Sequence, residues 1–325
     1  MLKKTALLLL VLLSSTLSAD ILNEYRLHGM QNMEQKMDKA LTKKSYWKQF
    51  LKNKDTTFGY LEKYSNVLTC NKSRSTLNLY TQDKNKHFKL KNKNDAFTGK
   101  NKGDKKREGD SRTPVGVYEL VDKKSKATKL DPFYGPYAFV TSYPNSYDNY
   151  KGKSGHGIWI HGLPESQKRD KFTKGCIAIQ NINLKKLEKK IDIKKTLLII
   201  NESWIKTDIS KDKLASILAQ IYSWRYAWLY SDIEKYLSFY SDDFIRFDGM
   251  KIEKFKRYKT RIFSKNEKKT ILFNDLNVVP YPNTKNSYQV TFREYYKSGS
   301  YKFEGNKSLM VKLDPSNKMK IFTEQ

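Results

Sequence analysis

The sequence predicts an α+β protein, because helical and strand-like periodicities occupy different parts of the chain. Near the N-terminus, apolar residues recur at spacings of three and four, which is typical of an amphipathic helix. Through the middle, short segments alternate between apolar and polar residues, as half-buried strands do. The last third shows the helical pattern over residues 209–244 and the alternating pattern after them. Helices and strands that are segregated in this way define the α+β class.

Residues 1–19 carry the pattern of a secretory signal peptide. Lys3 and Lys4 precede a short apolar run over residues 6–13, and small residues lead to Ala19. That run is too short to cross a bilayer, so we favour cleavage after Ala19 over an N-terminal anchor helix. We therefore expect an exported protein that is located in the periplasm of a Gram-negative cell.

Residues 20–66 are predicted to be helical. Leu27, Met30, Met33, Met37 and Leu41 form one apolar stripe at helical spacing. Helices with so few apolar residues bury little surface on their own. We expect them to pack on the next domain or on a second copy of the chain, and so to support a homodimer.

Residues 67–203 form the predicted central domain, which is mostly β. Alternation over residues 76–80 and 86–90 indicates half-buried strands. Pro114 fixes the backbone in a turn before the strand over residues 117–120. A stretch rich in tyrosine, proline and glycine follows over residues 132–150, and loops of that kind often form the wall of a groove. A short helix over residues 184–193 and a buried strand over residues 196–200 complete the domain.

Residues 208–325 form the predicted C-terminal domain. Two or three helices are expected over residues 209–244, and alternating segments are expected after Gly249. Helices followed by a curved antiparallel sheet resemble an NTF2-like cone fold. Such folds often hold a pocket, and we expect a glycan ligand there, although a fold alone does not determine function. The region contains neither histidine nor cysteine, so it offers no nucleophile–base pair of that type.

The net charge of +29 implies an anionic partner. Nucleic acid, an acidic membrane surface and an anionic polymer all meet that description. Because an exported protein does not normally meet nucleic acid, we exclude nucleic acid and favour the cell wall or outer envelope.

The segment 155–162 and the segment 173–179 carry the candidate chemistry. The first is a strand pattern that ends at His161 and Gly162, and the second begins a strand directly after Cys176. Two neighbouring strands would present an imidazole and a thiol at the same end of a sheet. The imidazole can then take the thiol proton and hold the thiolate as an ion pair.

Two other interpretations of these residues are less favoured. A zinc site would need further histidine or cysteine ligands, and the odd spacing of His156 and His161 would place them on opposite faces of a strand. A disulfide between Cys70 and Cys176 would remove the nucleophile. We therefore predict no metal, two unbridged cysteines, and a Cys70 that packs as a strand residue.

The motifs also resemble a known family. His161-Gly162 lies fifteen positions before Cys176 in a Thr-x-Gly-Cys-Ile setting, and residues 112–118 read Arg-Thr-Pro-Val-Gly-Val-Tyr. These motifs resemble the YkuD-type L,D-transpeptidase catalytic domain over roughly residues 67–200. In length and flanking segments the chain is similar to the L,D-carboxypeptidases that set helical cell shape in Helicobacter and Campylobacter. It departs from the family pattern at Thr173, Lys174 and Ala178, where serine, histidine and an arginine are usual.

The resemblance implies a peptidoglycan enzyme without a cofactor. Cys176 would be the nucleophile, His161 the proton acceptor and donor, and Gly162 the carbonyl that orients the imidazole. Gly175 would lie in the oxyanion region. Four residues are predicted to bind the stem-peptide substrate, namely Lys174, Thr173, Trp159 and Arg112.

The resemblance leaves the acceptor of the acyl group open. Water would make the enzyme a carboxypeptidase, whereas the amine of another stem peptide would make it a transpeptidase that forms 3-3 cross-links. The loop over residues 163–174 is strongly charged, so it is poorly suited to exclude water from the thioester. This favours water as the acceptor of the acyl group. The rival class is a non-catalytic protein that binds the wall or its glycan.

Overall fold

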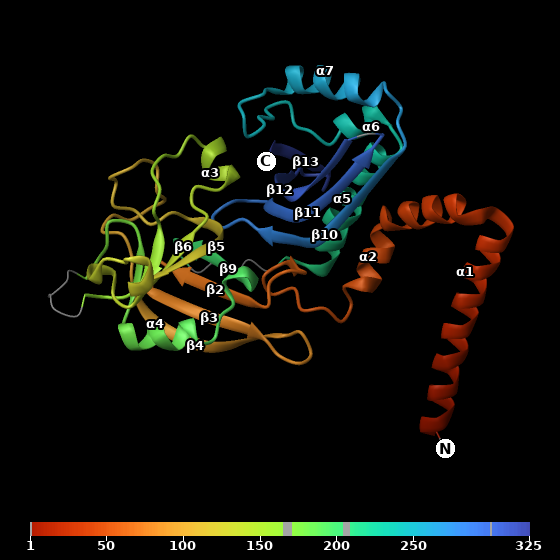
Figure 1. The fold of residues 1–325 in the computed structure, drawn as a ribbon. Coiled ribbons are helices and arrows are strands. Elements are labelled where there is room, and N and C mark those ends of the chain that lie inside the picture. The colour runs from red at the N-terminus through yellow and green to blue at the C-terminus, as the bar shows by residue number, and fades with distance from the viewer. Residues whose placement is uncertain (1, 165–170, 204–208, 300) are drawn as a thin grey trace.

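The computed structural model describes residues 2–164, 171–203, 209–299 and 301–325. Figure 1 shows N-terminal helices, a central barrel and a C-terminal domain of helices packed on a sheet. The predicted α+β class and the order of its three parts are confirmed.

The N-terminal helices pack on the C-terminal domain rather than on the barrel that follows them in the chain. Helix α1 (Leu2–Leu41) bends at Gly29, and α2 (Lys44–Phe50) follows it. Trp47 of α2 is buried in the C-terminal core, and Asp38 of α1 forms a buried ion pair of 2.8 Å with Arg225. No helix in the part of the chain that the structure describes is long and apolar enough to cross a membrane.

The prediction of helix up to residue 66 is wrong for its last part. Turns follow Phe50, and strand β1 (Tyr60–Leu61) pairs with a strand of the C-terminal sheet, with Tyr60 opposite Val278. The segment that enters the barrel is therefore tied first to a strand that lies more than two hundred residues later in the chain.

The central domain is a closed barrel with the strand order β2-β3-β4-β8-β7-β6-β5-β9. Its inner core is apolar, and alternation along β2 decides which residues reach it: Leu68 and Cys70 point inward, and Val67 packs outward. The strands are β2 (Asn66–Asn71), β3 (Thr76–Gln82), β4 (Phe88–Phe97), β5 (Gly116–Ser125), β6 (Tyr137–Thr141), β7 (Trp159–His161), β8 (Ile177–Ile179) and β9 (Thr196–Asn201). The helices beside them are η1 (Lys126–Thr128), η2 (Pro132–Tyr134), α3 (Ser146–Tyr150), α4 (Asn181–Glu188) and η3 (Ile193–Lys195).

The C-terminal domain packs helices on a five-stranded sheet of order β1-β10-β11-β12-β13, all antiparallel. We expected strands directly after Gly249, but a helix comes first, and its buried Phe255 and Phe263 join the core. The elements are α5 (Lys211–Leu229), α6 (Ile233–Leu237), α7 (Ile252–Phe263), β10 (Lys269–Pro280), β11 (Ser287–Ser298), β12 (Tyr301–Leu313) and β13 (Met319–Glu324).

A separate apolar cluster joins the barrel to the C-terminal sheet. Val67, Val117 and Ile199 from the outside of the barrel pack with Val279 and Met310 from the sheet. Burial of this surface favours a fixed arrangement of the two domains. The outer face of the C-terminal sheet therefore lies against the barrel, while its other face covers the domain's own core.

Candidate active site

The site is built where the short parallel strands β7 and β8 lie side by side. Their register places Ile160 opposite Ile177 and His161 opposite Ala178. Both isoleucines point into the barrel core. Because side chains alternate along a strand, His161 points to the opposite face, and Cys176 directly precedes β8. The segments that carry the imidazole and the thiol are therefore neighbours, and their pairing as base and nucleophile stays a prediction.

His161 is held in one tautomer by the next residue in the chain. Its side chain is buried, and Nδ1 donates a hydrogen bond of 2.7 Å to the carbonyl oxygen of Gly162. An imidazole that carries its proton on Nδ1 presents Nε2 as the base. The ring of Tyr134 packs edge-on at 5.0 Å between ring centroids, which restricts the orientation of the imidazole further. The contact predicted for Gly162 is present, and its catalytic role stays a prediction.

Gly162 is a glycine because a side chain has no room there. A Cβ atom at this position would lie 2.2 Å from Oδ1 of Asn181. The Asn181 amide holds the chain after Gly162, since Oδ1 accepts from the Leu163 N–H at 2.7 Å and Nδ2 donates to the Leu163 carbonyl at 2.8 Å. Sequence reasoning missed Asn181 and did not single out Tyr134 from its aromatic stretch.

Thr173 shapes the turn that presents Cys176. Its hydroxyl accepts from the Gly175 N–H at 3.0 Å and donates to the Cys176 carbonyl at 2.7 Å. The side chain is only 3% exposed. The prediction that Thr173 contacts substrate is therefore corrected to a positioning role. The Gly175 N–H is occupied by its bond to the Thr173 hydroxyl, and the oxyanion role of Gly175 stays a prediction.

Gly175 adopts a backbone conformation that other residues rarely take. Its φ is +139°, and a Cβ atom would lie 3.0 Å from the carbonyl oxygen of Arg112. A side chain at position 175 would therefore strain the backbone and displace the next residue, Cys176.

If Cys176 is the nucleophile, we expect Gly175→Ala to lower the catalytic rate by roughly 10²-fold, because a small misplacement of a nucleophile is costly. Strain of this kind also costs about 1–3 kcal/mol of stability. Gly152→Ala is the matched control, since Gly152 has φ +66° with open space around it. Activity assays and thermal unfolding of both variants check this, and equal activity in the two would contradict it.

The two cysteines differ in their surroundings. Cys176 is partly exposed, and its Sγ lies 3.4 Å from the carbonyl oxygen of Gly157. Cys70 is a free thiol in the barrel core, where burial raises its pKa to about 12. A thiol with so high a pKa is a poor nucleophile near neutral pH. Cys70 is therefore a packing residue, as predicted.

The argument that separated His156 from His161 by strand parity is wrong. Strand β7 begins only at Trp159, and both Gly155 and Gly157 have positive φ, so the segment before it is irregular. His156 is exposed on that segment. Exposure, rather than the face of a strand, is what distinguishes it from His161.

The remaining predicted residues surround this pair. Trp159 is half-buried and packs on Tyr134, with 5.0 Å between their ring centroids, and Lys174 is exposed. Arg112 lines a hollow of about 470 Å³ together with Lys106 and Arg107. The charged residues Glu165, Lys168, Arg169 and Asp170 of the predicted polar loop lie outside the described residues. Within the described ranges, no group of three His, Cys, Asp or Glu residues is placed to hold a metal ion.

Comparison with known proteins agrees with this architecture. Residues 65–200 match the YkuD family, described as the L,D-transpeptidase catalytic domain. The crystal structure of the helical cell shape determining protein Pgp2 from Campylobacter jejuni is 41% identical, with a TM-score of 0.79, and the match covers 87% of this chain and 99% of that one. The chain belongs to the YkuD family that includes Pgp2.

Other comparisons extend the match beyond the YkuD domain. Residues 216–325 match the Cds6 C-terminal NTF2-like domain, which confirms the predicted fold of that part. The K307A mutant of Pgp2 is 40% identical, with a TM-score of 0.81 and coverage of 88% and 99%. Bd1075 of Bdellovibrio bacteriovorus is 27% identical, with a TM-score of 0.63 and coverage of 81% and 92%. No curated protein sequence gives a significant match.

Proposed function

We propose that this YkuD-family protein is a periplasmic L,D-carboxypeptidase that removes the terminal D-alanine from tetrapeptide stems of peptidoglycan and leaves tripeptides. The observation that carries the proposal is that His161 ends β7 and Cys176 directly precedes the adjacent parallel strand β8, with Nδ1 of the imidazole bonded to the Gly162 carbonyl. The proposed biological role is in helical cell shape, by analogy with Pgp2, whose name states that role.

The proposed reaction proceeds through a thioester. Nε2 of His161 takes the proton of the Cys176 thiol, and the thiolate attacks the carbonyl carbon between the diamino acid and D-alanine. The N–H of Cys176 is our candidate donor to the oxyanion, because the Gly175 N–H is occupied by Thr173. His161 then gives its proton to the leaving amine, and the C–N bond breaks. Water, deprotonated by the same imidazole, opens the thioester and restores the thiol.

The basic hollow beside Arg112 is the proposed site for a carboxylate of the substrate. The arginine usual at position 178 is replaced by Ala178, which is fully buried. Arg112 lies next to the nucleophile turn, because its carbonyl oxygen approaches Gly175. Its Nε is buried with no hydrogen-bond partner among the described residues, which leaves a donor for an anion.

We expect Arg112→Ala to raise KM for tetrapeptide by roughly tenfold, because a charge-assisted hydrogen bond contributes about 1.5–3 kcal/mol. The change in kcat should be smaller if the side chain binds the ground state and the transition state equally. Lys126→Ala removes the same charge from an exposed position on η1 and should leave KM unchanged. Steady-state kinetics measure KM for both variants. An equal rise in KM for both would mean that only the total charge of the protein matters, which would contradict a specific contact at Arg112.

Product analysis tests the choice of acceptor. Purified protein is incubated with tetrapeptide muropeptides, and products are identified by mass spectrometry. Tripeptide monomers with released D-alanine support hydrolysis, whereas dimers joined between two diamino acids would establish the transpeptidase alternative. If neither forms and a cysteine-directed probe leaves Cys176 unlabelled in the folded protein, the non-catalytic wall-binding class is favoured.

The C-terminal domain contains a second proposed binding site, for a glycan that carries a carboxylate. A hollow of about 620 Å³ has the aromatic residues Tyr301 and Phe303 in its lining. Lys259 lies within it, with Nζ at 5.0 Å from the ring centroid of Trp228. Burial lowers the pKa of Lys259 to about 8, and burial also raises the pKa of Glu294 in the same lining. A buried ammonium beside aromatic rings suits a sugar that bears an anionic group.

The affinity of this hollow for a carboxylate-bearing wall fragment is expected to fall as pH rises through about 8, because Lys259 loses its charge there. Below that pH the ammonium attracts the anion, and above it the neutral amine does not. Calorimetric titrations at pH 7 and pH 9 measure the difference. Lys259→Met should bind weakly and equally at both pH values, and a native affinity that does not change with pH would contradict the assignment.

Export and self-association complete the proposal. The leader pattern over residues 1–19 supports secretion, which signal-sequence fusions to a periplasmic reporter would test.

On α1, Leu27, Met30 and Met37 are 55%, 64% and 49% exposed, which supports a homodimer through the N-terminal helices. Light scattering of Met30→Glu should show a monomer where the native protein is a dimer, and a monomeric native protein would refute the homodimer.

A further inference from the structure

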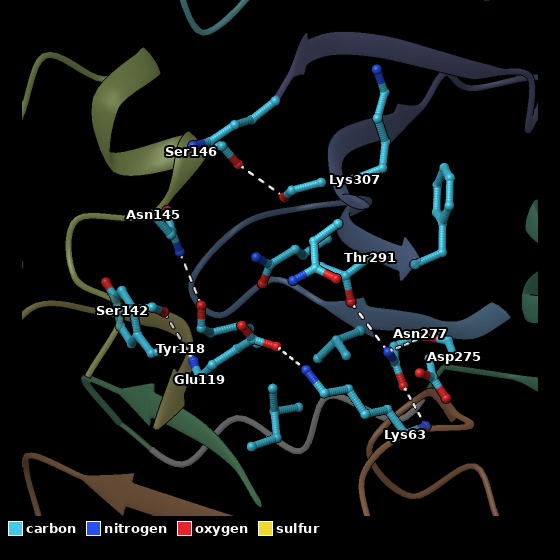
Figure 2. Close-up of a pocket in the computed structure, with 18 of the residues that line it drawn as sticks. Lys63, Tyr118, Glu119, Ser142, Asn145, Ser146, Asp275, Asn277, Thr291 and Lys307 are labelled. Atoms are coloured by element: carbon cyan, nitrogen blue, oxygen red, sulfur yellow. Dashed lines mark hydrogen bonds and ion pairs between the residues drawn. The ribbon is translucent and has the colours of Figure 1, made fainter. Parts of the chain in front are cut away.

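A cleft of about 430 Å³ lies between the barrel and the outer face of the C-terminal sheet (Figure 2). One wall consists of β5 and the segment 142–146 after β6, and the other consists of β10, β11 and β12. Lys63, which precedes the barrel, also reaches the cleft. Its volume is within the usual range for ligand sites, about 300–1,000 Å³. The lining of the cleft does not include Cys176, and it shares Lys307 and Gln325 with the lining of the hollow that contains Lys259.

Strand alternation makes the sheet wall of the cleft polar. Along β11, Val290 and Phe292 turn toward the core of the C-terminal domain, although the cleft still reaches Phe292. Gln289 and Thr291 therefore point to the other face, where they line the cleft. On the neighbouring strand, Asn306 lies on the same wall.

Gln289 supplies a buried acceptor that is not satisfied. The side chain is 8% exposed, and its Oε1 has no hydrogen-bond partner among the described residues. A buried amide oxygen of this kind lowers stability unless it receives a hydrogen bond. A ligand with an N–H or O–H group in the cleft would donate that bond.

The cations of the cleft are already neutralised by the protein. Lys63 is 2.7 Å from the Glu119 carboxylate. Figure 2 marks this ion pair with a dashed line. Arg293 pairs with Glu304 at 2.9 Å, and Lys307 lies 3.7 Å from Glu324. A charged stem peptide would have to compete with these pairs, whereas a neutral ligand would not.

The other polar groups are hydroxyls and amides. Asn277 donates to the Thr291 hydroxyl at 3.2 Å, and the hydroxyls of Ser146 and Ser308 are 3.1 Å apart across the two walls. At the edge, Asp275 and Asn306 are exposed and can accept from ligand hydroxyls. Groups of this type suit a sugar that carries hydroxyls and an acetamido group.

We propose that this cleft binds a neutral N-acetylated saccharide, with the acetamido N–H donating to Oε1 of Gln289. The site does not depend on the reaction at Cys176. It lies on the opposite face of the C-terminal sheet from the Lys259 hollow and takes a ligand without charge. Occupation of both faces would hold a polysaccharide against the catalytic barrel.

Titration of the full-length mature protein with N,N′-diacetylchitobiose tests the proposal. Isothermal calorimetry should show weak, saturable binding that Gln289→Leu reduces by roughly fivefold or more, as expected for one lost hydrogen bond. Asn306→Ala, an exposed change that leaves the fold intact, should weaken binding as well. Tyr301→Ala in the other hollow is the control and should bind as the native protein does. The two cleft variants should still release D-alanine from a short soluble muropeptide, because the cleft lining does not include Cys176 or His161.

Four results would overturn the proposal. In the first case the native protein would show no saturable binding of the disaccharide. In the second case Gln289→Leu and Asn306→Ala would bind the disaccharide as tightly as the native protein does. In the third case Tyr301→Ala, and not the cleft variants, would lose binding, which would place the sugar in the Lys259 hollow. In the fourth case a charged tetrapeptide without sugar would bind in the cleft, and Gln289→Leu would weaken that binding. The ligand of the cleft would then be a peptide rather than a saccharide. Failure of D-alanine release would refute the proposed reaction and leave this result unaffected.

Discussion

Cys176→Ala is expected to fold and to lose D-alanine release by roughly 10⁴-fold or more, because the thioester can no longer form. The side chain is partly exposed at the end of a turn held by Thr173, so little packing is lost. Thermal unfolding should therefore change little. Mass spectrometry of the products from tetrapeptide muropeptides measures the activity.

Cys70→Ala is the matched control for this variant. Cys70 lies in the barrel core, so its replacement should cost about 1 kcal/mol of stability and leave the rate unchanged. The two cysteine variants are thus expected to show opposite effects on activity and stability. Comparable loss of activity in both would instead indicate that the two thiols act together.

His161→Gln is expected to lower the rate by roughly 10²–10⁴-fold, the usual contribution of a general acid–base group. The residue is 1% exposed, and glutamine fills more of its volume than alanine does. The thiol of Cys176 then lacks its proton acceptor, and the leaving amine lacks its donor. Single-turnover kinetics with tetrapeptide, together with thermal unfolding, separate lost chemistry from lost folding.

His156→Ala provides the control for the imidazole. The residue is exposed on an irregular segment, so the variant should keep most of the activity and all of the stability. A larger loss in His156→Ala than in His161→Gln would mean that the wrong imidazole has been assigned as the base.

Local pattern predicted the two segments of the candidate site, because each segment is a short motif. The strand that ends at His161 and the Gly-Cys turn before β8 are short motifs, and the bond from His161 to Gly162 joins neighbouring residues. Thr173 was misassigned because composition alone cannot show that a hydroxyl is used twice by the backbone of its own turn. Asn181 was missed because it acts across a distance of eighteen residues.

Helix α7 was missed although the sequence contains a signal for it. Ile252, Phe255 and Ile262 fall on one face at helical spacing, and numerous lysines and arginines between them obscured the pattern. In contrast, no local pattern predicts that Tyr60 lies opposite Val278 in the sheet or that Asp38 forms an ion pair with Arg225. These contacts join segments that are far apart in the chain.

Periodicity and short motifs are local properties of the chain, so they were sufficient to predict the order of the parts and most of their helices and strands. They also predicted His161 and Cys176 as the reactive pair, a role that stays a prediction. Only the tertiary structure decided that the N-terminal helices pack on α5, that β1 completes the C-terminal sheet and that a polar cleft separates the barrel from that sheet. The physical reason is that the strands determine only which side chains share a face. What each face meets depends on burial between residues that lie far apart in the chain.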